Sequence, residues 1–309
     1  MLETQRGATT GKRSTPVVNP LAMRVAQAAF GGLGELAPDV MSRLAYKLYF
    51  TPRRFRRPET EAAYLRKAER FSVSTSVGEV AAYAWTPQGA YPWDSRATVR
   101  NVLLVHGWEG RGTQLGAFIE PLRARGCRVV AFDAPAHGHS EGERSNVLQF
   151  VEAIHAVTRM VGPLSGVVAH SMGGASLTLA MAEGLPVDRA VLVASPCYLD
   201  NVMRNFVRML HLTPETERRL RRMVEADFGA DVWQRLSVPS LAHALQTPAL
   251  IIHDEDDGEV AFSEGLAVHQ SWSGSRLHVT RGLGHRRVLK DGLVIDEVVG
   301  FLMGERDGA

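Results

Sequence analysis

Val167-Val168-Ala169-His170-Ser171-Met172-Gly173-Gly174 is the stretch that decides the fold of this chain. Its apolar start is typical of a short buried strand, and its glycines indicate a sharp turn into a helix expected over residues 175–183. A serine on such a turn presents its hydroxyl at the edge of the sheet, in the pattern Gly-x-Ser-x-Gly of a nucleophile elbow, with Ala169 in place of the first glycine. An ordinary turn or helix-cap serine is the alternative, so the partners that a nucleophile needs must come from the rest of the chain.

The composition is that of a folded globular protein. Of 309 residues, 45% are apolar and 22% are charged, which excludes wholesale disorder. The net charge is only +2, yet residues 1–70 hold 13 of the 35 Lys and Arg and only 6 of the 33 Asp and Glu. A solvated helical face or contact with an anionic surface are the two interpretations of this basic region.

Targeting signals and cysteine content favour a cytoplasmic protein. Cys127 and Cys197 are too few for a disulfide framework and adjoin apolar strand-like runs, which favours buried thiols in a reducing compartment. The N-terminus opens no apolar signal region, and no run reaches the ~18 apolar residues of a membrane span. We therefore expect no stable membrane insertion.

The N-terminal part, residues 1–70, is predicted to be a tail followed by a helical extension. Residues 1–20 are polar and form the tail. Apolar residues then recur at helical spacing over 21–50, interrupted at 31–34 and at Pro38, which predicts two short helices packed as a hairpin. Cover for the core is their expected role, with a membrane-surface patch as the alternative. The basic segment 51–58 is expected to be a linker into a helix over 59–70.

Residues 71–309 are predicted to form one α/β domain. Alternation over 71–77 and 80–85, with a glycine between them, indicates an antiparallel hairpin, and a loop follows over 87–96. Continuous apolar runs then alternate with helical patterns, which is typical of a mostly parallel sheet flanked by helices. The expected strands are 102–105, 129–132, 166–169, 190–194, 250–252 and 277–280; the expected helices are 114–125, 146–160, 175–183, 263–272 and 291–302.

One gap between strands is too long for a simple crossover and is predicted to be a helical lid over residues 197–246. Met203, Phe206, Val207 and Leu210 fall on one apolar helical face. Thr213-Pro214-Glu215 has the chemistry of a helix start, and Gly229 ends that helix. Such an insertion lies above the carboxyl edge of the sheet.

Polar residues follow the ends of separate strands. His106-Gly107-Trp108 follows the first parallel run, Ser171 follows the third, 253–257 (His-Asp-Glu-Asp-Asp) follows the fifth and His285 follows the last. In a parallel sheet these ends share one edge. The chain order is therefore serine, acid, histidine, which is the order of a hydrolase triad on this topology.

These motifs resemble the α/β-hydrolase fold superfamily of the serine hydrolase or esterase type. Residues 71–302 carry the resemblance, which is strongest to a functionally unassigned bacterial group with a His-Gly-Trp loop and a Gly-Leu-Gly-His-Arg-Arg ending. Ala169 and Ala136 stand where glycine is usual, and Asp254 stands where the group commonly has His-Gly. The first 70 residues lie outside the core fold.

The resemblance implies a role for each site residue. Ser171 is the nucleophile, His285 the general base and acid, and Asp257 the orienting acid, with Asp256 as its alternative. The backbone N–H groups of Trp108 and Met172 form the oxyanion hole. The candidate substrate pocket consists of Trp108, Met203, Phe206 and Leu210.

Hydrolysis of a small-molecule carboxylic ester through an acyl-enzyme is the expected reaction. The same triad also serves thioesterases, acyltransferases and carbon–carbon hydrolases, and a non-catalytic binding protein on a hydrolase scaffold is the alternative of another class. No cofactor is expected. The His137-Gly138-His139 and 254–257 clusters lack the spacing of zinc and calcium sites, and no nucleic-acid motif is present.

Overall fold

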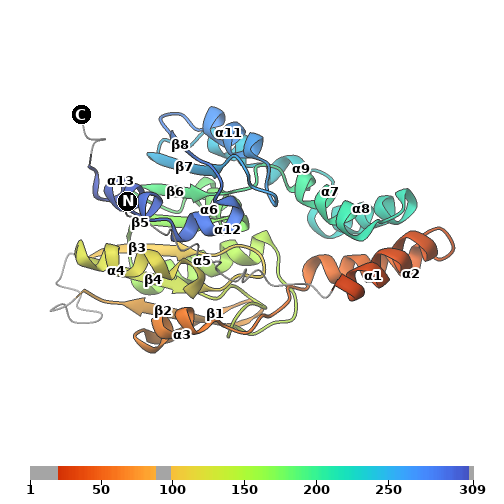
Figure 1. Ribbon diagram of the computed structural model, residues 1–309, viewed down its shortest axis with the longest axis horizontal. Helices are drawn as coiled ribbons and strands as arrows, with labels where there is room; N and C mark the ends of the chain where they lie inside the picture. The colour runs from red at the N-terminus through yellow and green to blue at the C-terminus, as the bar shows by residue number, and fades with distance from the viewer. Residues whose placement is uncertain (1–19, 88–98, 306–309) are drawn as a thin grey trace, which may run out of the picture.

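The predicted α/β fold is confirmed by a computed structural model that describes residues 20–87 and 99–305. The predicted tail and the predicted loop at 87–96 fall outside these residues, apart from Pro20 and Pro87. In the described residues, eight strands form one sheet (Figure 1). They are β1 (Glu69–Thr75), β2 (Gly78–Trp85), β3 (Arg100–Val105), β4 (Cys127–Phe132), β5 (Leu164–His170), β6 (Ala190–Val193), β7 (Ala249–Asp254) and β8 (Arg276–Thr280).

The sheet is mostly parallel, with an antiparallel edge. Its strand order is β1-β2-β4-β3-β5-β6-β7-β8. β1 and β2 form the expected hairpin, β2 pairs antiparallel with β4, and all later pairs are parallel. Because β3, β5, β6 and β7 are neighbours, the loops that follow them meet at one edge, where the sequence places its polar residues.

Helices cover both faces of the sheet, and successive residues of the central strands enter opposite cores. Leu103 and Val105 belong to the cluster beneath α5 and α6, whereas Val102 and Leu104 belong to the cluster beneath α4 and α13. The first face carries α5 (Val147–Val161), α6 (Met172–Ala182), α10 (Val238–Ala242) and α11 (Phe262–Ser271); the second carries α3 (Glu59–Arg66), η1 (Gly112–Phe118), α4 (Ile119–Ala124), η2 (Val288–Lys290) and α13 (Gly292–Met303).

Three predicted helices differ from those in the structure. The helix expected over 175–183 begins earlier, at Met172 directly after the serine. The expected helix over 114–125 begins as the 3₁₀ segment η1 and becomes α-helical only at α4, because Leu115 leaves helical geometry (φ −88°, ψ 19°). The expected helix over 59–70 ends at Arg66, because Glu69 and Arg70 already pair with Ala84 and Tyr83 in the sheet. Sheet pairing outweighs local helical preference there.

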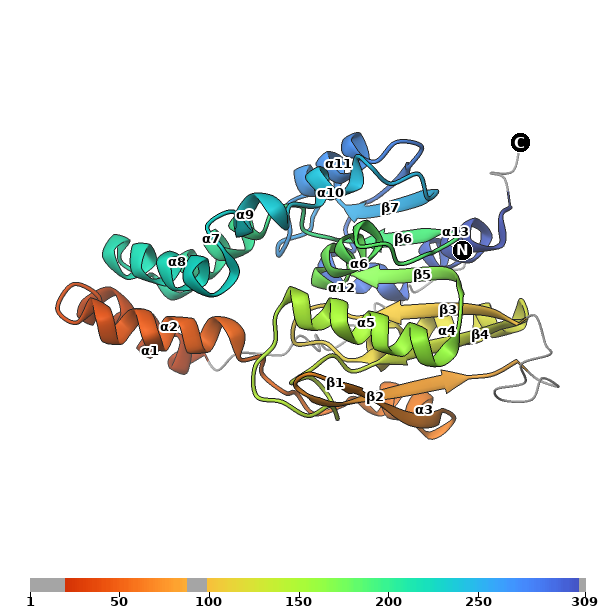
Figure 2. The same ribbon diagram turned by 180° about the vertical axis from the view of Figure 1, so that it is seen from behind.

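Four helices project beyond the sheet, and they come from two distant parts of the chain. α1 (Pro20–Leu33) and α2 (Pro38–Phe50) lie beside α7 (Leu199–Leu210) and α8 (Pro214–Phe228) in both ribbon views (Figures 1 and 2). α1 packs on α7 and α2 packs on α8. We call these four helices the helical projection. The N-terminal hairpin was expected to cover the core. Its buried residues, among them Phe30 and Phe50, join the apolar core where the hairpin packs on the insertion helices α7 and α8.

The second half of the insertion returns to the sheet. α9 (Val232–Arg235) follows the projection, and α10 packs against α6 and α11 on the flank of the sheet. In the segment predicted as a lid over 197–246, α7 and α8 thus belong to the helical projection, whereas α10 covers the flank of the sheet.

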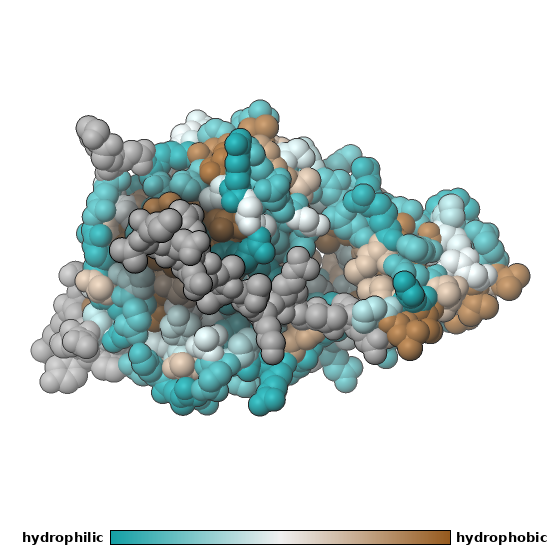
Figure 3. All heavy atoms as spheres, in the orientation of Figure 1, coloured by the Kyte–Doolittle hydropathy of each residue, from teal (hydrophilic) through white to brown (hydrophobic). Residues whose placement is uncertain are grey.

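The outer surface of α1 and α2 is unusually apolar. Hydrophobic residues gather at this end of the molecule in Figure 3. The exposed large side chains there are Leu21, Val25, Leu33, Leu36, Val40 and Leu44. Within the described residues, neither these helices nor any other is long and apolar enough to span a membrane.

Candidate active site

Ser171 occupies a strained turn between β5 and α6. Its backbone has φ 54° and ψ −127°, a left-handed conformation that a non-glycine residue adopts only where its surroundings impose it. The turn is imposed by two bonds: Ser171 N donates to Val193 O (2.9 Å), and Ser171 O accepts from Gly174 N (2.8 Å). As a result Ser171 lines a large cavity at the carboxyl edge of the sheet.

Two glycines let the neighbouring backbone approach this turn. A Cβ on Gly107 would lie 2.7 Å from Ser171 Cβ, and one on Gly173 would lie 2.5 Å from the carbonyl oxygen of His106. Any larger residue at either position would push the loop after β3 away from the serine. Ala169, which replaces the first glycine of the motif, is fully buried between β3 and β6.

Asp257 and His285 are joined by a hydrogen bond. Asp257 Oδ2 lies 2.8 Å from His285 Nδ1, and Asp257 Oδ1 accepts from the amides of Glu259 (2.8 Å) and Val260 (2.9 Å). Burial acts to raise the pKa of Asp257, but the hydrogen bond from His285 and these amides outweigh it, so the pKa lies below its usual value. The carboxylate is therefore ionised at neutral pH and keeps a proton on His285 Nδ1.

The two neighbouring aspartates bind backbone and hydroxyl groups instead. Asp254 accepts from Asp256 N (3.0 Å), Thr280 Oγ1 (2.7 Å) and Leu283 N (3.0 Å). Asp256 Oδ2 accepts from Gly282 N (2.9 Å). Asp254 and Asp256 therefore tie the loop after β7 to the loop after β8, which positions Asp257 against His285.

Ser171 and His285 line the same cavity without bonding one another. Among the described residues no hydrogen bond joins Ser171 Oγ to His285, and His285 Nε2 lies 3.9 Å from Glu259 Oε2. Such contacts commonly tighten only when substrate is bound. His170, adjacent to the serine, lies against the His285 ring, with ring centroids 4.7 Å apart. The Nε2 atom of His170 also forms a hydrogen bond with the backbone carbonyl oxygen of His285 (2.9 Å).

Two buried histidines hold the loop that carries Trp108. His106 Nε2 accepts from Ala134 N (2.9 Å), and His137 Nε2 accepts from Glu109 N (3.1 Å). Both rings must be neutral to accept in this way, and burial accordingly lowers the pKa of His106 to about 4 and that of His137 to about 3. Trp108 packs edge-on against His137, with ring centroids 5.3 Å apart.

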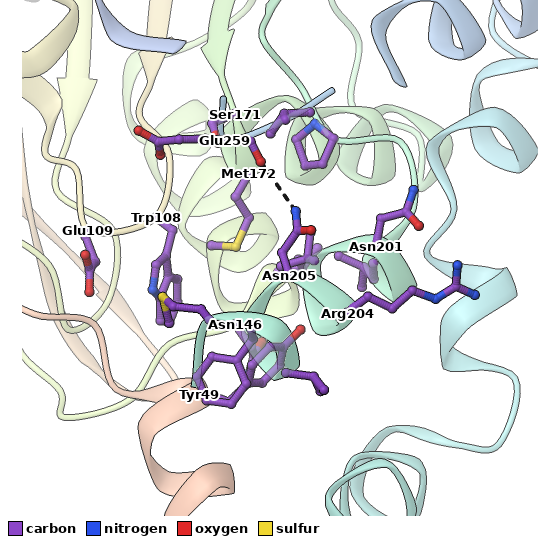
Figure 4. Close-up of a pocket in the computed structure, with 18 of the residues that line it drawn as sticks. Tyr49, Trp108, Glu109, Asn146, Ser171, Met172, Asn201, Arg204, Asn205 and Glu259 are labelled. Carbon is purple, nitrogen blue, oxygen red and sulfur yellow. Dashed lines mark hydrogen bonds between the residues drawn. The ribbon is translucent and has the colours of Figure 1, made fainter. Parts of the chain in front are cut away.

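Trp108 and Met172 flank the serine from two sides. Trp108 follows β3, Met172 is the first residue of α6, and both line the cavity beside Ser171 (Figure 4). The first amides of a helix have no partner within it, so the Met172 N–H is available to a bound oxyanion.

The cavity has a volume of about 1560 Å³ and lies between the carboxyl edge of the sheet and the helical projection. Of the predicted pocket residues, Trp108, Phe206 and Leu210 line it. Met203 does not: it is fully buried in the apolar core on the other side of α7. The helical spacing identified an apolar face of α7, but part of that face is ordinary helix packing.

Sequence reasoning missed the contribution of the N-terminal segment. Met23, Leu48, Tyr49 and Phe50 line the cavity from α1 and α2. The basic segment that follows is more than a linker, because Arg53 pairs with Glu109, next to Trp108 (2.6 Å). The cluster of arginines at 53–57 was the sequence signal that could have indicated this contact. The two interpretations of the basic region, a solvated helical face and contact with an anionic surface, did not include an ion pair inside the protein.

The His-x-His and acidic clusters make internal contacts. His137 Nδ1 lies 2.9 Å from Pro135 O, and His139 Nδ1 lies 3.1 Å from the Tyr83 hydroxyl. Among residues 20–87 and 99–305, no group of three or more His, Cys, Asp and Glu side chains is arranged to hold a metal ion.

Comparison with known proteins gives matches to hydrolases. The model of the alpha/beta hydrolase family matches residues 102–297. A pyrethroid hydrolase from Sphingobium wenxiniae is 32% identical over 84 residues, which are 26% of this chain and 30% of the length of that relative.

Solved structures share the fold. Est1E from Butyrivibrio proteoclasticus superposes with a TM-score of 0.60 at 18% identity, over 76% of this chain and 98% of Est1E. The carboxylesterase CesB from Bacillus subtilis gives 0.58 at 16% identity, over 86% of this chain and all of CesB, and a bromoperoxidase from Bacillus anthracis gives 0.58 at 17%, over 77% of this chain and all of the bromoperoxidase. At these identities the likeness concerns the fold alone.

Proposed function

Because the chain belongs to the alpha/beta hydrolase family, we propose that it is a serine-dependent hydrolase of carboxylic esters, with Ser171, His285 and Asp257 as its triad. One observation carries the proposal. Ser171 is held at positive φ on a strand-to-helix turn, in the same cavity as the Asp257–His285 hydrogen bond. Strain of this kind at a solvent-accessible serine is a feature of catalytic sites.

Each group has a defined role in the proposed reaction, and His285 acts first as base and then as acid in both halves of it. Asp257 keeps the His285 proton on Nδ1, so that Nε2 accepts the proton of Ser171 as its oxygen attacks the ester carbonyl. The oxyanion is bound by the N–H groups of Trp108 and Met172. His285 then gives its proton to the departing alcohol. Water, deprotonated by His285, attacks the acyl-enzyme, and the acid leaves as Ser171 recovers its proton.

The relatives support ester hydrolysis over other serine chemistries. Carboxylesterases and esterases from several bacteria share the fold, and the curated relative is a pyrethroid hydrolase. The serine also distinguishes this chain from members of the fold that use an aspartate nucleophile.

Covalent labelling with a fluorophosphonate tests the proposal. We expect the purified full chain to be labelled once, and Ser171→Ala to abolish both labelling and hydrolysis of 4-nitrophenyl esters. Ser240→Ala serves as the matched control because Ser240 lies on α10 and bonds Ser237, outside the cavity. A folded wild-type protein that takes no label would contradict the proposal and favour a binding protein on this scaffold.

A further inference from the structure

The wall of the cavity that faces Ser171 comes from two segments far apart in the sequence. Tyr49 on α2 meets Phe206 on α7 edge-on, with ring centroids 5.1 Å apart, and both line the cavity. Phe50 meets Phe228 of α8 at 5.5 Å. In Figure 4 Tyr49 lies on the α2 side of the pocket and Ser171 on the side of the sheet. Neither segment forms this aromatic wall alone.

The arginine segment after α2 fastens this wall to the loops around the serine. Arg53 binds the Glu109 carboxylate through Nε (2.6 Å) and Nη2 (2.7 Å), and its own amide donates to the same group (3.2 Å). Arg54 donates to four carbonyl oxygens of the loop after β4, those of Ala136, Gly138, Ser140 and Gly142. The end of α2 is therefore held at a set distance from the Trp108 loop.

Most of the charged side chains that border the wall are paired within the protein and so offer no strong counterion to a charged substrate. The pairs are Arg53–Glu109 (2.6 Å), Arg204–Asp200 (2.5 Å), Arg221–Glu217 (2.8 Å) and Arg286–Glu259 (3.0 Å). Arg208 on α7 also lines the cavity; it donates to the amide oxygen of Asn205 and has no carboxylate partner among the described residues.

The size of the cavity argues against a small substrate. At about 1560 Å³ it exceeds the roughly 300–1,000 Å³ of common ligand sites. A short ester at Ser171 would leave the aromatic wall in contact with water. A bulky apolar group would cover it and gain the free energy of apolar burial.

We propose that the substrate is an ester with a bulky apolar group, and that α2 and α7 together hold this group, with Tyr49 and Phe206 as specificity-determining residues. The inference rests on the proposed function, because it assigns a substrate class to the same serine. It makes the N-terminal helical extension part of the substrate site.

Two ester series on the full chain test the substrate class. One varies the acyl group, from 4-nitrophenyl acetate to octanoate; the other varies the alcohol, from ethyl to octyl benzoate. We expect kcat/KM to rise about tenfold or more along at least one series, since burying several CH₂ groups contributes about 0.8 kcal/mol each. Values that stay level or fall along both series would overturn the inference.

Variants of Tyr49, Phe206 and Val202 test whether the apolar group of the substrate binds at this wall. Tyr49→Ala and Phe206→Ala are each expected to lower the long-to-short ratio of kcat/KM about fivefold or more, whereas Tyr49→Phe retains it because the ring remains. Val202→Trp, which fills the cavity from α7, is expected to lower the ratio as well. Leu36→Ala is the matched control, because Leu36 is 81% exposed between α1 and α2 and does not line the cavity.

The outcomes separate the two proposals. If esters are hydrolysed through Ser171 but kcat/KM does not rise along either series, the substrate class is wrong and the hydrolase stands. If kcat/KM rises with chain length but the ratio is unchanged in Tyr49→Ala, Phe206→Ala and Val202→Trp, the assignment of the wall to α2 and α7 is wrong. If the ratio falls equally in Leu36→Ala, loosening of the helices and not loss of contacts is the cause, and the assignment of the wall fails. If Ser171 takes no label and no ester is hydrolysed, both proposals fall.

Discussion

Asp257 has both oxygens of its carboxylate occupied, one by His285 and one by two backbone amides. Its neighbour Asp256 is bonded to Gly282 N, on the adjoining loop. The two side chains are adjacent in sequence and chemically identical, so their different roles come from the direction in which the loop turns after β7. The pairing of Asp257 with His285 therefore depends on the backbone turn after β7.

Asp257→Asn and Asp256→Asn should therefore differ sharply in activity. We expect Asp257→Asn to lower kcat for 4-nitrophenyl butyrate by roughly 10²–10⁴-fold, because an amide neither fixes the histidine tautomer nor stabilises the imidazolium. Asp256→Asn should stay within about threefold of wild type, since an asparagine oxygen can still accept from Gly282 N and the Asp257–His285 bond is untouched. If the larger loss falls on Asp256, the acid is misassigned.

The segment between α2 and α3 is the element that joins the helical projection to the sheet. Arg54 is its central contact, with one guanidinium bonded to four carbonyl oxygens between 2.8 and 3.2 Å away. Arg57 reaches the buried carboxylate of Asp133 (3.2 Å). These arginines use their fixed donor geometry, which a lysine does not reproduce.

Removing the Arg54 side chain should destabilise the fold. Arg54→Ala is expected to lower the free energy of unfolding by about 1–3 kcal/mol, because charged donors to several carbonyls are lost. Arg56 is exposed like Arg54 but makes none of these bonds to the loop after β4, so Arg56→Ala should change the free energy of unfolding by less than about 0.5 kcal/mol. Urea denaturation followed by circular dichroism measures both; equal effects would show that Arg54 is an ordinary surface arginine.

Across the whole molecule, several histidines are buried in the neutral state. His106 and His137 hold the Trp108 loop, and His170 supports His285; burial lowers the pKa of all three below the usual value for histidine. Below about pH 6.5 the unfolded chain binds protons at these positions and the folded chain does not, so stability falls as the pH falls. The lowered pKa of Asp257 acts in a separate window, below about pH 4.

The free energy of unfolding should therefore fall between pH 6.5 and 4.5, by about 1.4 kcal/mol per pH unit for each such histidine. Urea midpoints measured across this range test the expectation. His137→Gln should reduce the slope by about one proton, even if it lowers stability at every pH. Midpoints that stay level from pH 6.5 to 4.5 would contradict the lowered pKa of His106, His137 and His170.

Much of the fold followed from local pattern. The positions of the strands along the chain, the hairpin at 71–85 and the turn at Ser171 depend on apolar runs and on glycines close in sequence, which physical chemistry links directly to backbone geometry. The differences between prediction and structure were also local. The helix expected over 59–70 ends at Arg66 because Glu69 and Arg70 pair with β2 in the sheet. Met203 was placed in the pocket because helical spacing identifies an apolar face without saying what it packs against.

The sequence by itself determined the α/β class, the carboxyl edge that gathers the polar residues, and the candidate residues Ser171, Asp257 and His285. Only the tertiary structure decided that α1 and α2 pack on α7 and α8, that Arg53 reaches Glu109, and that Tyr49 faces the cavity with Phe206. The reason is the range of the interactions. A turn or a strand is specified by neighbours in the chain, whereas Gln27 and Met209, whose side chain and carbonyl bond at 2.9 Å, are 182 residues apart and meet only in the folded molecule.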